Sequence, residues 1–190
     1  MTAARKLAIA GVLVVGATAA AAFALRTHAA SDGMRLSNSG RPVTVLRGLV
    51  VRTAHIRDGH LLATRSGRAL YRLDRANAAP CFGVGPADDV GSIDAATCTR
   101  GRFPTTGHPV LDFSVYEGTR HDVRELSLYR VEGLAADGVD SVEFLRPNGK
   151  VALSVPVSEN AYATTEVPSD VPVAGYAAVD KAGKRLWRSP

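Results

Sequence analysis

The sequence predicts a mainly β protein: an Ig-like antiparallel β-sandwich with an upstream disulfide-bearing β-hairpin region, after an N-terminal signal or anchor helix. Three observations lead to this fold class. An uncharged apolar run occupies Leu7–Leu25, the only two cysteines are Cys81 and Cys98, and short apolar stretches alternate with turn residues from about Pro109. Four parts are expected: a signal peptide or membrane anchor (1–30), a flexible tether (31–42), a hairpin and disulfide-loop region (43–105) and an Ig-like β-sandwich (106–190).

The N-terminal segment has the order of an export signal, because Arg5 and Lys6 precede the apolar run and Arg26 follows it. The run is longer than a signal core of roughly 7–15 residues and close to the ~20 residues that cross a bilayer, so cleavage and retention both stay open. Thr27–Ala29 offers the small residues that a signal peptidase requires, and a buried core helix is the remaining alternative. We therefore expect an extracytoplasmic protein, secreted or anchored by a single N-terminal transmembrane helix.

The net charge of the chain gives no argument for nucleic acid as a partner. The formal net charge is +5, but Arg5, Lys6 and Arg26 belong to the N-terminal segment, which leaves 20 basic against 18 acidic residues from residue 31 onward. Such a balance gives no basic surface by composition alone. Residues 31–42 are polar and contain Gly, Ser and Asn, a composition typical of a flexible tether.

The two cysteines are expected to form a disulfide, since an oxidising compartment favours it and the closed loop contributes about 3 kcal/mol. A redox pair would need two intervening residues, and a zinc site would need two further ligands. Inside the loop, Asp88, Asp89 and Asp94 lack the spacing that wraps a calcium ion. The sequence therefore predicts a disulfide within a solvated acidic loop.

Three stretches predict β-hairpins, because each has two apolar-rich segments around a polar turn that ends in glycine and a basic residue. They are Leu61–Leu73 around Gly67, Val142–Val157 around Gly149 and Tyr176–Trp187 around Gly183. Pro147 and Pro156 cannot donate to a strand ladder, so the second hairpin is expected at a sheet edge. Thr44–Arg57 stays open between an amphipathic helix and a strand, although Gly48 and the β-branched residues weaken the helix.

Strand candidates then recur at near-regular spacing, which favours the Ig-like sandwich. They cover residues 110–116, 126–134, 139–145, 150–157, 161–167, 173–180 and 184–188. The predicted core comprises Phe113, Leu128, Val131, Val142, Phe144, Leu153, Val155, Val179 and Leu186.

The run Gly133–Phe144 (GLAADGVDSVEF), then PNGK, then Pro156–Tyr162 (PVSENAY) resembles a module of uncharacterised exported actinobacterial proteins. In them a GL-x-x-DGV strand turn precedes a hairpin and a PV-x-x-N-x-[FY] strand, and a hairpin and a cysteine pair lie upstream. The resemblance covers about residues 60–185 and implies no activity. Physically, Asp137 and Gly138 suit a turn. Asn160 is expected to bond its own backbone at a turn, with a ligand-contacting amide as the alternative.

Two clusters are candidates for catalysis. His55, Asp58 and His60 combine two imidazoles with a carboxylate, but the two histidines face opposite sides of a strand, and Gly59 indicates a turn. His108, Asp112 and Ser114 lie within seven residues. Ser114 is expected on the polar side of an alternating strand, and no nucleophile elbow, P-loop or dinucleotide fingerprint occurs.

The predicted function is therefore that of an exported, non-enzymatic β-domain with a binding or structural role at the cell envelope or outside it. Its expected partner is an unidentified protein or envelope component. No catalytic residue, cofactor, metal ion or nucleic acid is expected, and a membrane is involved only through the N-terminal segment if that segment is not cleaved. The alternative is a metal-dependent or serine hydrolase that uses His55, Asp58 and His60, or His108 and Ser114.

Overall fold

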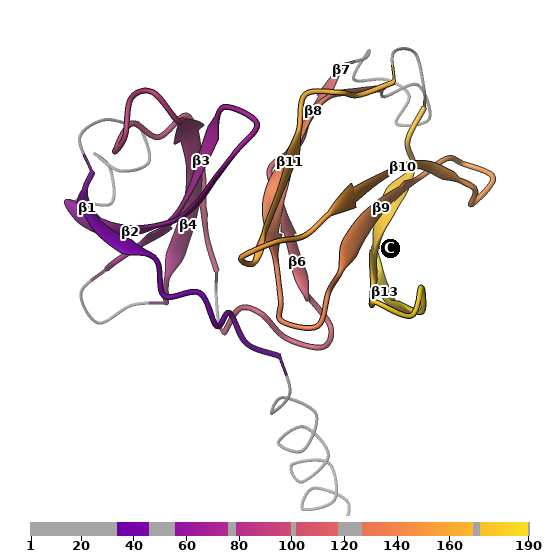
Figure 1. Ribbon diagram of the computed structural model, residues 1–190, viewed down its shortest axis with the longest axis horizontal. Coiled ribbons are helices and arrows are strands. Elements are labelled where there is room, and N and C mark those ends of the chain that lie inside the picture. Colours follow the sequence, from indigo (N-terminus) through magenta and orange to yellow (C-terminus); the bar gives the residue numbers. More distant parts are fainter. Residues whose placement is uncertain are drawn as a thin grey trace, which may run out of the picture. The chain divides into compact units, whose positions relative to one another are not determined.

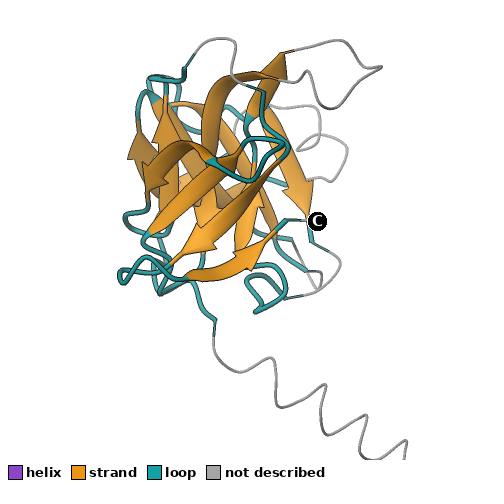
Figure 2. Cartoon of the chain, turned by 90° about the vertical axis from the view of Figure 1, so that its right-hand side faces the viewer, coloured by secondary structure: helices purple, strands orange, loops and turns teal. Residues whose placement is uncertain are grey.

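The computed structural model describes residues 34–45, 56–75, 79–99, 102–117, 127–168 and 172–189. They fall within one compact unit that begins at Met34, and they contain strands and loops but no helix (Figure 2). It follows that none of these residues forms a helix able to cross a membrane. The predicted signal or anchor, most of the ambiguous stretch 44–57 and His55 lie outside the described residues.

The first sheet is an antiparallel meander drawn in indigo to magenta in Figure 1. Its strands are β1 (Arg41–Thr44), β2 (Asp58–Arg65), β3 (Arg68–Leu73), β4 (Cys81–Pro86) and β5 (Ala95–Cys98), in the order β1-β2-β3-β4-β5. The hairpin around Gly67 is confirmed, with φ values of 45° at Ser66 and 72° at Gly67. The turn expected at Gly59 is wrong, because Gly59 lies within β2 and pairs with Val43 and Leu73.

This sheet buries both of its faces, which explains why β3 and β4 are almost continuously buried. One face packs Tyr71, Leu73 and Cys81 with residues of the same sheet and its loops. The other face packs Leu70 and Phe82 with apolar residues of later strands and of the segments at both ends of the sheet: Leu36, Phe103, Leu111, Phe113, Leu134 and Ala161. The first sheet and the later strands therefore share one apolar cluster.

The later strands form two further antiparallel sheets. They are β6 (Val110–Asp112), β7 (Val115–Glu117), β8 (Ser127–Ala135), β9 (Ser141–Leu145), β10 (Val151–Pro156), β11 (Ala161–Thr164), β12 (Gly175–Val179) and β13 (Arg185–Arg188). One sheet has the order β10-β9-β12-β13; the other has the order β11-β8-β6, with β7 also paired to β8. The candidate at 110–116 is thus two strands, and Ser114 lies between them and not on a strand.

The other two hairpins are confirmed, as β9–β10 and β12–β13. β10 is an edge strand, as the prolines of this hairpin, Pro147 and Pro156, predict. Gly138, Gly149 and Gly183 have φ values of 85°, 77° and 78°, so each predicted turn glycine has the positive φ that its turn requires.

A common core joins the two later sheets. Phe144 of β9 and Tyr162 of β11 are fully buried, and their ring centroids are 6.5 Å apart. Of the predicted core residues, six are buried: Leu128, Val131, Val142, Phe144, Val155 and Val179. Phe113 and Leu153 are partly buried at the margins of the core. The prediction for Leu186 is wrong, since this side chain is 36% exposed. The strand register is irregular just before Trp187, so the Trp187 ring packs against the core in place of Leu186.

Residues 34–42 differ from the flexible tether that their composition predicts. Asn38 donates from its side-chain amide to the carbonyls of Leu62, at 2.6 Å, and Glu159, at 2.9 Å. The amide of Asp137 donates to the carbonyl of Arg35 at 2.7 Å, and β1 begins at Arg41. The polar residues of this segment form hydrogen bonds with the folded domain. Composition alone cannot predict that they do so.

Candidate functional site

In the candidate cluster of His55, Asp58 and His60, the structure adds a partner for His60 that the sequence did not indicate, Asp74. His60 Nε2 lies 3.2 Å from Asp74 Oδ2. Both residues line a hollow of about 350 Å³ together with Pro42, Val43, Thr44, Asp58 and Gly59. His60 Nδ1 is buried and has no hydrogen-bond partner among the described residues. Among the described residues no group of three or more His, Cys, Asp and Glu side chains is placed to bind a metal ion.

The second cluster is not assembled as a catalytic triad. The Ser114 hydroxyl donates to Asp112 Oδ1 at 2.6 Å and accepts from the amide of Glu132 at 3.3 Å. His108 is exposed, and its ring centroid lies 6.4 Å from that of Trp187. No hydrogen bond between His108 and Ser114 occurs in the described part of the chain, so a base for Ser114 is missing there.

Asp112 is instead the centre of a cluster of hydroxyl groups. Its carboxylate accepts from Ser114, from Tyr162 at 2.9 Å and from Tyr116 at 3.0 Å. Burial raises the pKa of Asp112, although the hydroxyl bonds oppose that effect. Burial, with the nearby carboxylate, also raises the pKa of Tyr162 and Tyr116, and that of Tyr176 to about 12. The cluster therefore satisfies a buried carboxylate and connects β6, β7 and β11.

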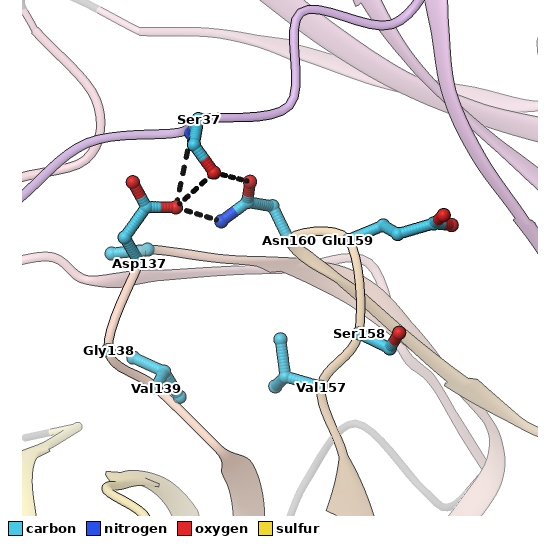
Figure 3. Close-up of a pocket in the computed structure, with 9 residues that line it drawn as sticks. Ser37, Asp137, Gly138, Val139, Val157, Ser158, Glu159 and Asn160 are labelled. Carbon is cyan, nitrogen blue, oxygen red and sulfur yellow. Dashed lines mark hydrogen bonds between the residues drawn. The ribbon is translucent and has the colours of Figure 1, made fainter.

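A polar hollow of about 330 Å³ lies where the two halves of the Gly133–Tyr162 motif meet (Figure 3). It is lined by Ser37, Ala136, Asp137, Gly138, Val139, Val157, Ser158, Glu159 and Asn160. Asp137 Oδ1 accepts from Asn160 Nδ2 at 2.8 Å and from the backbone and hydroxyl of Ser37. Burial raises the pKa of Asp137, but these hydrogen bonds outweigh it and the pKa lies below its usual value. The hollow thus presents a carboxylate to solvent.

Asn160 does not bond its own backbone as expected. Its φ is 63° and it is only 7% exposed. Its side-chain nitrogen donates to the carbonyl of Ala135, at 3.0 Å, and to Asp137. Its side-chain oxygen accepts from the backbone N–H of Asn38 at 3.0 Å. Every polar group of this side chain is occupied, so Asn160 joins the N-terminal segment to the end of β8 and is not free to contact a ligand.

The motif also contains a steric pair. Tyr162 and Gly133 are register partners on β11 and β8. A Cβ atom at Gly133 would lie within 2.3 Å of the Tyr162 hydroxyl oxygen and 2.5 Å of the Leu111 carbonyl oxygen. The glycine is required because the tyrosine ring crosses its strand on the way to Asp112.

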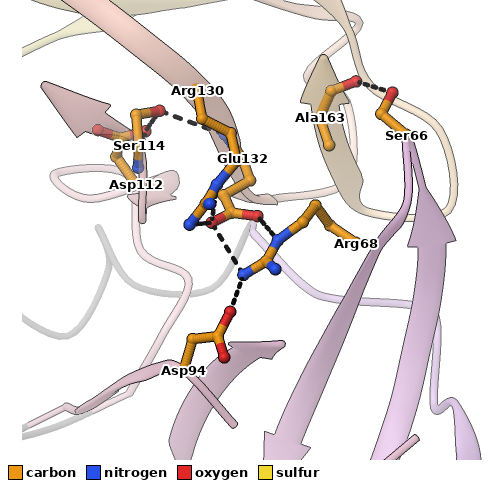
Figure 4. Close-up of polar contacts among 8 residues, drawn as sticks. All are labelled: Ser66, Arg68, Asp94, Asp112, Ser114, Arg130, Glu132 and Ala163. Atoms are coloured by element: carbon orange, nitrogen blue, oxygen red, sulfur yellow. Dashed lines mark hydrogen bonds and ion pairs between the residues drawn. The ribbon is translucent and has the colours of Figure 1, made fainter. Parts of the chain in front are cut away.

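A buried ionic network joins the first sheet to β8 (Figure 4). Glu132 is fully buried and accepts from Arg68 Nε at 2.6 Å and from Arg130 Nε at 3.0 Å. Arg68 also bonds Asp94 at 2.7 Å. Burial lowers the pKa of Arg68, but the bonds to both carboxylates outweigh it and raise the pKa overall. No sequence pattern indicated this role for Glu132, which lies in an ordinary strand pattern.

The disulfide is present between Cys81 and Cys98, which are register partners on β4 and β5. The amide of Thr99 donates to the carbonyl of Pro80, so the cysteines form the neighbouring non-hydrogen-bonded pair, where Cα atoms approach most closely. In the loop between them Asp88 and Asp89 are exposed, as expected. Asp94 is exposed as well, but it also bonds Arg68.

Comparisons of the chain with protein-family models, with curated proteins and with solved structures found no match. The resemblance to exported actinobacterial proteins therefore remains a prediction, and the geometry above carries the functional proposal.

Proposed function

We propose that this chain is an exported, non-enzymatic β-domain that binds a protein or envelope component outside the cytoplasm, either released or anchored by its N-terminal segment. The observation that carries the proposal is how the polar side chains are used. Asp112, Ser114, Glu132 and Asn160 are all bonded to structural partners. Their arrangement stabilises a fold and presents no paired nucleophile and base.

The Cys81–Cys98 disulfide supports the location, because disulfides persist in oxidising compartments. The resemblance of the Gly133–Tyr162 motif to exported actinobacterial modules agrees with it. We further propose that β6–β13 form an Ig-like sandwich. Support comes from the two antiparallel sheets and from the apolar cluster, to which both sheets contribute.

One observation favours a second candidate, a hydrolase or metal-dependent enzyme. His60 and Asp74 are paired beside an open hollow that also includes Asp58. A histidine oriented by a carboxylate is the usual form of a general base. This candidate requires His60 to act on a bound substrate or metal ion.

The two candidates are distinguished by crosslinking in intact cells that encode the protein. A photoreactive amino acid is placed at Ser158 on the rim of the polar hollow, at Leu186 on β13 and, as a control, at Thr64 on β2, all of which are exposed. The binding proposal predicts a crosslinked product of constant mass from Ser158 or Leu186, absent from Thr64 and unchanged by His60→Ala. If no position gives a discrete product while His60→Ala abolishes a hydrolytic activity or a stoichiometric metal content, the enzyme is the correct candidate.

A further inference from the structure

The β12–β13 hairpin carries four exposed basic side chains. Lys181 and Lys184 lie in the turn, and Arg185 and Arg188 lie on β13. Arg185 pairs with Glu143 at 3.0 Å, whereas the other three have no ion-pair partner within the described ranges. A local positive charge therefore remains on this hairpin, although the exported part of the chain is nearly neutral.

β13 is also an edge strand, since within the described residues it pairs only with β12. The amide of Ser189 donates to the carbonyl of Tyr176 at 2.8 Å. Because backbone groups alternate in an antiparallel pair, the N–H and C=O of the preceding residue, Arg188, point away from β12. Leu186 and Arg188 are exposed, so this edge is open to solvent.

The charges determine which strand can use this edge. Two copies that paired through β13 would bring Arg185 and Arg188 of each copy close to those of the other, and like charges across a strand pair are destabilising. Basic residues on an edge strand therefore disfavour self-association. The same residues attract a strand that carries carboxylates.

We propose that the free edge of β13 binds an acidic, extended polypeptide segment that pairs with it as an added strand. This inference rests on the proposed binding function and names its class of partner. Backbone hydrogen bonds supply affinity, carboxylates facing Lys184 and Arg188 supply selectivity, and Leu186 offers an apolar contact. A polypeptide is favoured over an anionic envelope polymer because only a polypeptide can complete the hydrogen-bond ladder of an edge strand.

The opposite edge of the same sheet provides an internal contrast. β10 carries no charged side chain, and Pro156 within it has no N–H to donate. The proposal therefore predicts strand addition at β13 and not at β10.

The test is an NMR titration of the ¹⁵N-labelled protein with a short acetylated peptide of alternating Glu and Val. Shifts are expected in the amides of β13, with none in β10. A peptide N-methylated at alternate residues, which cannot complete the ladder, should bind at least tenfold more weakly. Arg188→Ser should weaken binding of the first peptide about tenfold. Arg146→Ser, the same charge change at the exposed β9–β10 turn, should leave it unchanged, and the dispersion of each spectrum verifies folding.

Two results would overturn the proposal. If the N-methylated peptide and polyphosphate bind as tightly as the first peptide, the hairpin is a patch for anionic polymers. If the amides of β13 do not shift, its charges serve only to prevent self-association.

Either failure is separable from failure of the proposed function. If the cellular crosslinks persist while the peptide does not bind β13, only the strand-addition mode is wrong; if the peptide binds while no position crosslinks in cells, the binding function is wrong.

Discussion

The first sheet, β1–β5, and the strands β6–β13 stabilise antiparallel structure in different ways. In the first sheet every strand pairs with its neighbour in sequence, and a disulfide joins the last two strands. The later sheets combine hairpins with pairs of strands that are distant in sequence, β8 with β11 and β9 with β12. They contain no cysteine and enclose bonded polar groups, Asp112 and Asn160. A covalent link thus accompanies local connectivity here, whereas buried hydrogen bonds fix the partners of non-local strands.

The largest effect is expected where the two regions join. Glu132→Ala removes the carboxylate that Arg68 contacts, and the Arg68 side chain is only 11% exposed. Arg68 would keep its ion pair with Asp94, whose side chain is 48% exposed, but loss of the fully buried partner should still lower the free energy of unfolding by about 3–5 kcal/mol. Urea denaturation measures the loss. The control is Glu143→Ala, which removes a carboxylate that is more exposed than Glu132 and is paired with the exposed Arg185. Its expected loss is under about 1 kcal/mol. Equal losses in both variants would contradict a special role for the buried Glu132.

Removal of the disulfide should affect mainly the first sheet. The double variant Cys81→Ala, Cys98→Ala is expected to lose about 2–4 kcal/mol, because the unfolded chain gains freedom. Hydrogen exchange should increase more at Phe82 and Val84 of β4 than at Val142 of β9. A uniform increase would show that the regions unfold only together, which would weaken the comparison.

In the later strands, Gly133→Ala should cost roughly 1–3 kcal/mol, because the added methyl group overlaps the Tyr162 ring and the Leu111 carbonyl. The matched control is Gly107→Ala, where the nearest atom to the added Cβ is 4.0 Å away. That change should stay within about 0.5 kcal/mol. Thermal unfolding measures the stability of both variants. An unchanged stability for Gly133→Ala would mean that the Tyr162 ring does not cross β8 as described.

The smallest effect is a pair of opposite pH dependences. Burial raises the pKa of Asp112 in the folded protein. Between the unfolded value of about 3.9 and the higher folded pKa, the folded state therefore binds more protons than the unfolded state. The free energy of unfolding falls as pH rises through this range. Asp112→Asn should remove this fall, as measured by urea midpoints from acid to neutral pH.

Asp137 should behave in the opposite way. Although burial opposes them, hydrogen bonds from Asn160 and Ser37 lower its pKa. Its contribution is complete above the unfolded value of about 3.9 and is lost as pH falls through the lower folded pKa. Asp137→Asn should therefore destabilise the protein more at neutral than at acid pH. Identical pH profiles for the two variants would refute the different environments assigned to these carboxylates.

The sequence predicted what adjacent residues decide. Gly67, Gly149 and Gly183 determine the turns of three hairpins because a positive φ is a local requirement, and all three turns are found. The cysteine pairing followed from there being only two cysteines in a chain whose N-terminal segment predicts export. Both predictions needed no knowledge of how distant strands pair.

The candidate site needed that knowledge and was mostly missed. Asn160 has a turn conformation, yet its partners, Ala135 and Asn38, lie far away in sequence. Glu132 looks like a solvent-facing strand residue until Arg68 is brought against it by the first sheet. Leu186 was misassigned to the core because one irregular position changes which side chain faces inward.

Whether this chain is an exported, disulfide-linked domain is decided by the intact mass of the protein recovered from the cells that encode it, alkylated without prior reduction. The expected mass is two hydrogens below that of the dithiol, with no alkylation, and corresponds to a chain that begins near Ala30 if the segment is cleaved or at Met1 if it is an anchor. Alkylation of both Cys81 and Cys98 would contradict an exported, disulfide-linked domain and would reopen redox or metal chemistry at these two residues.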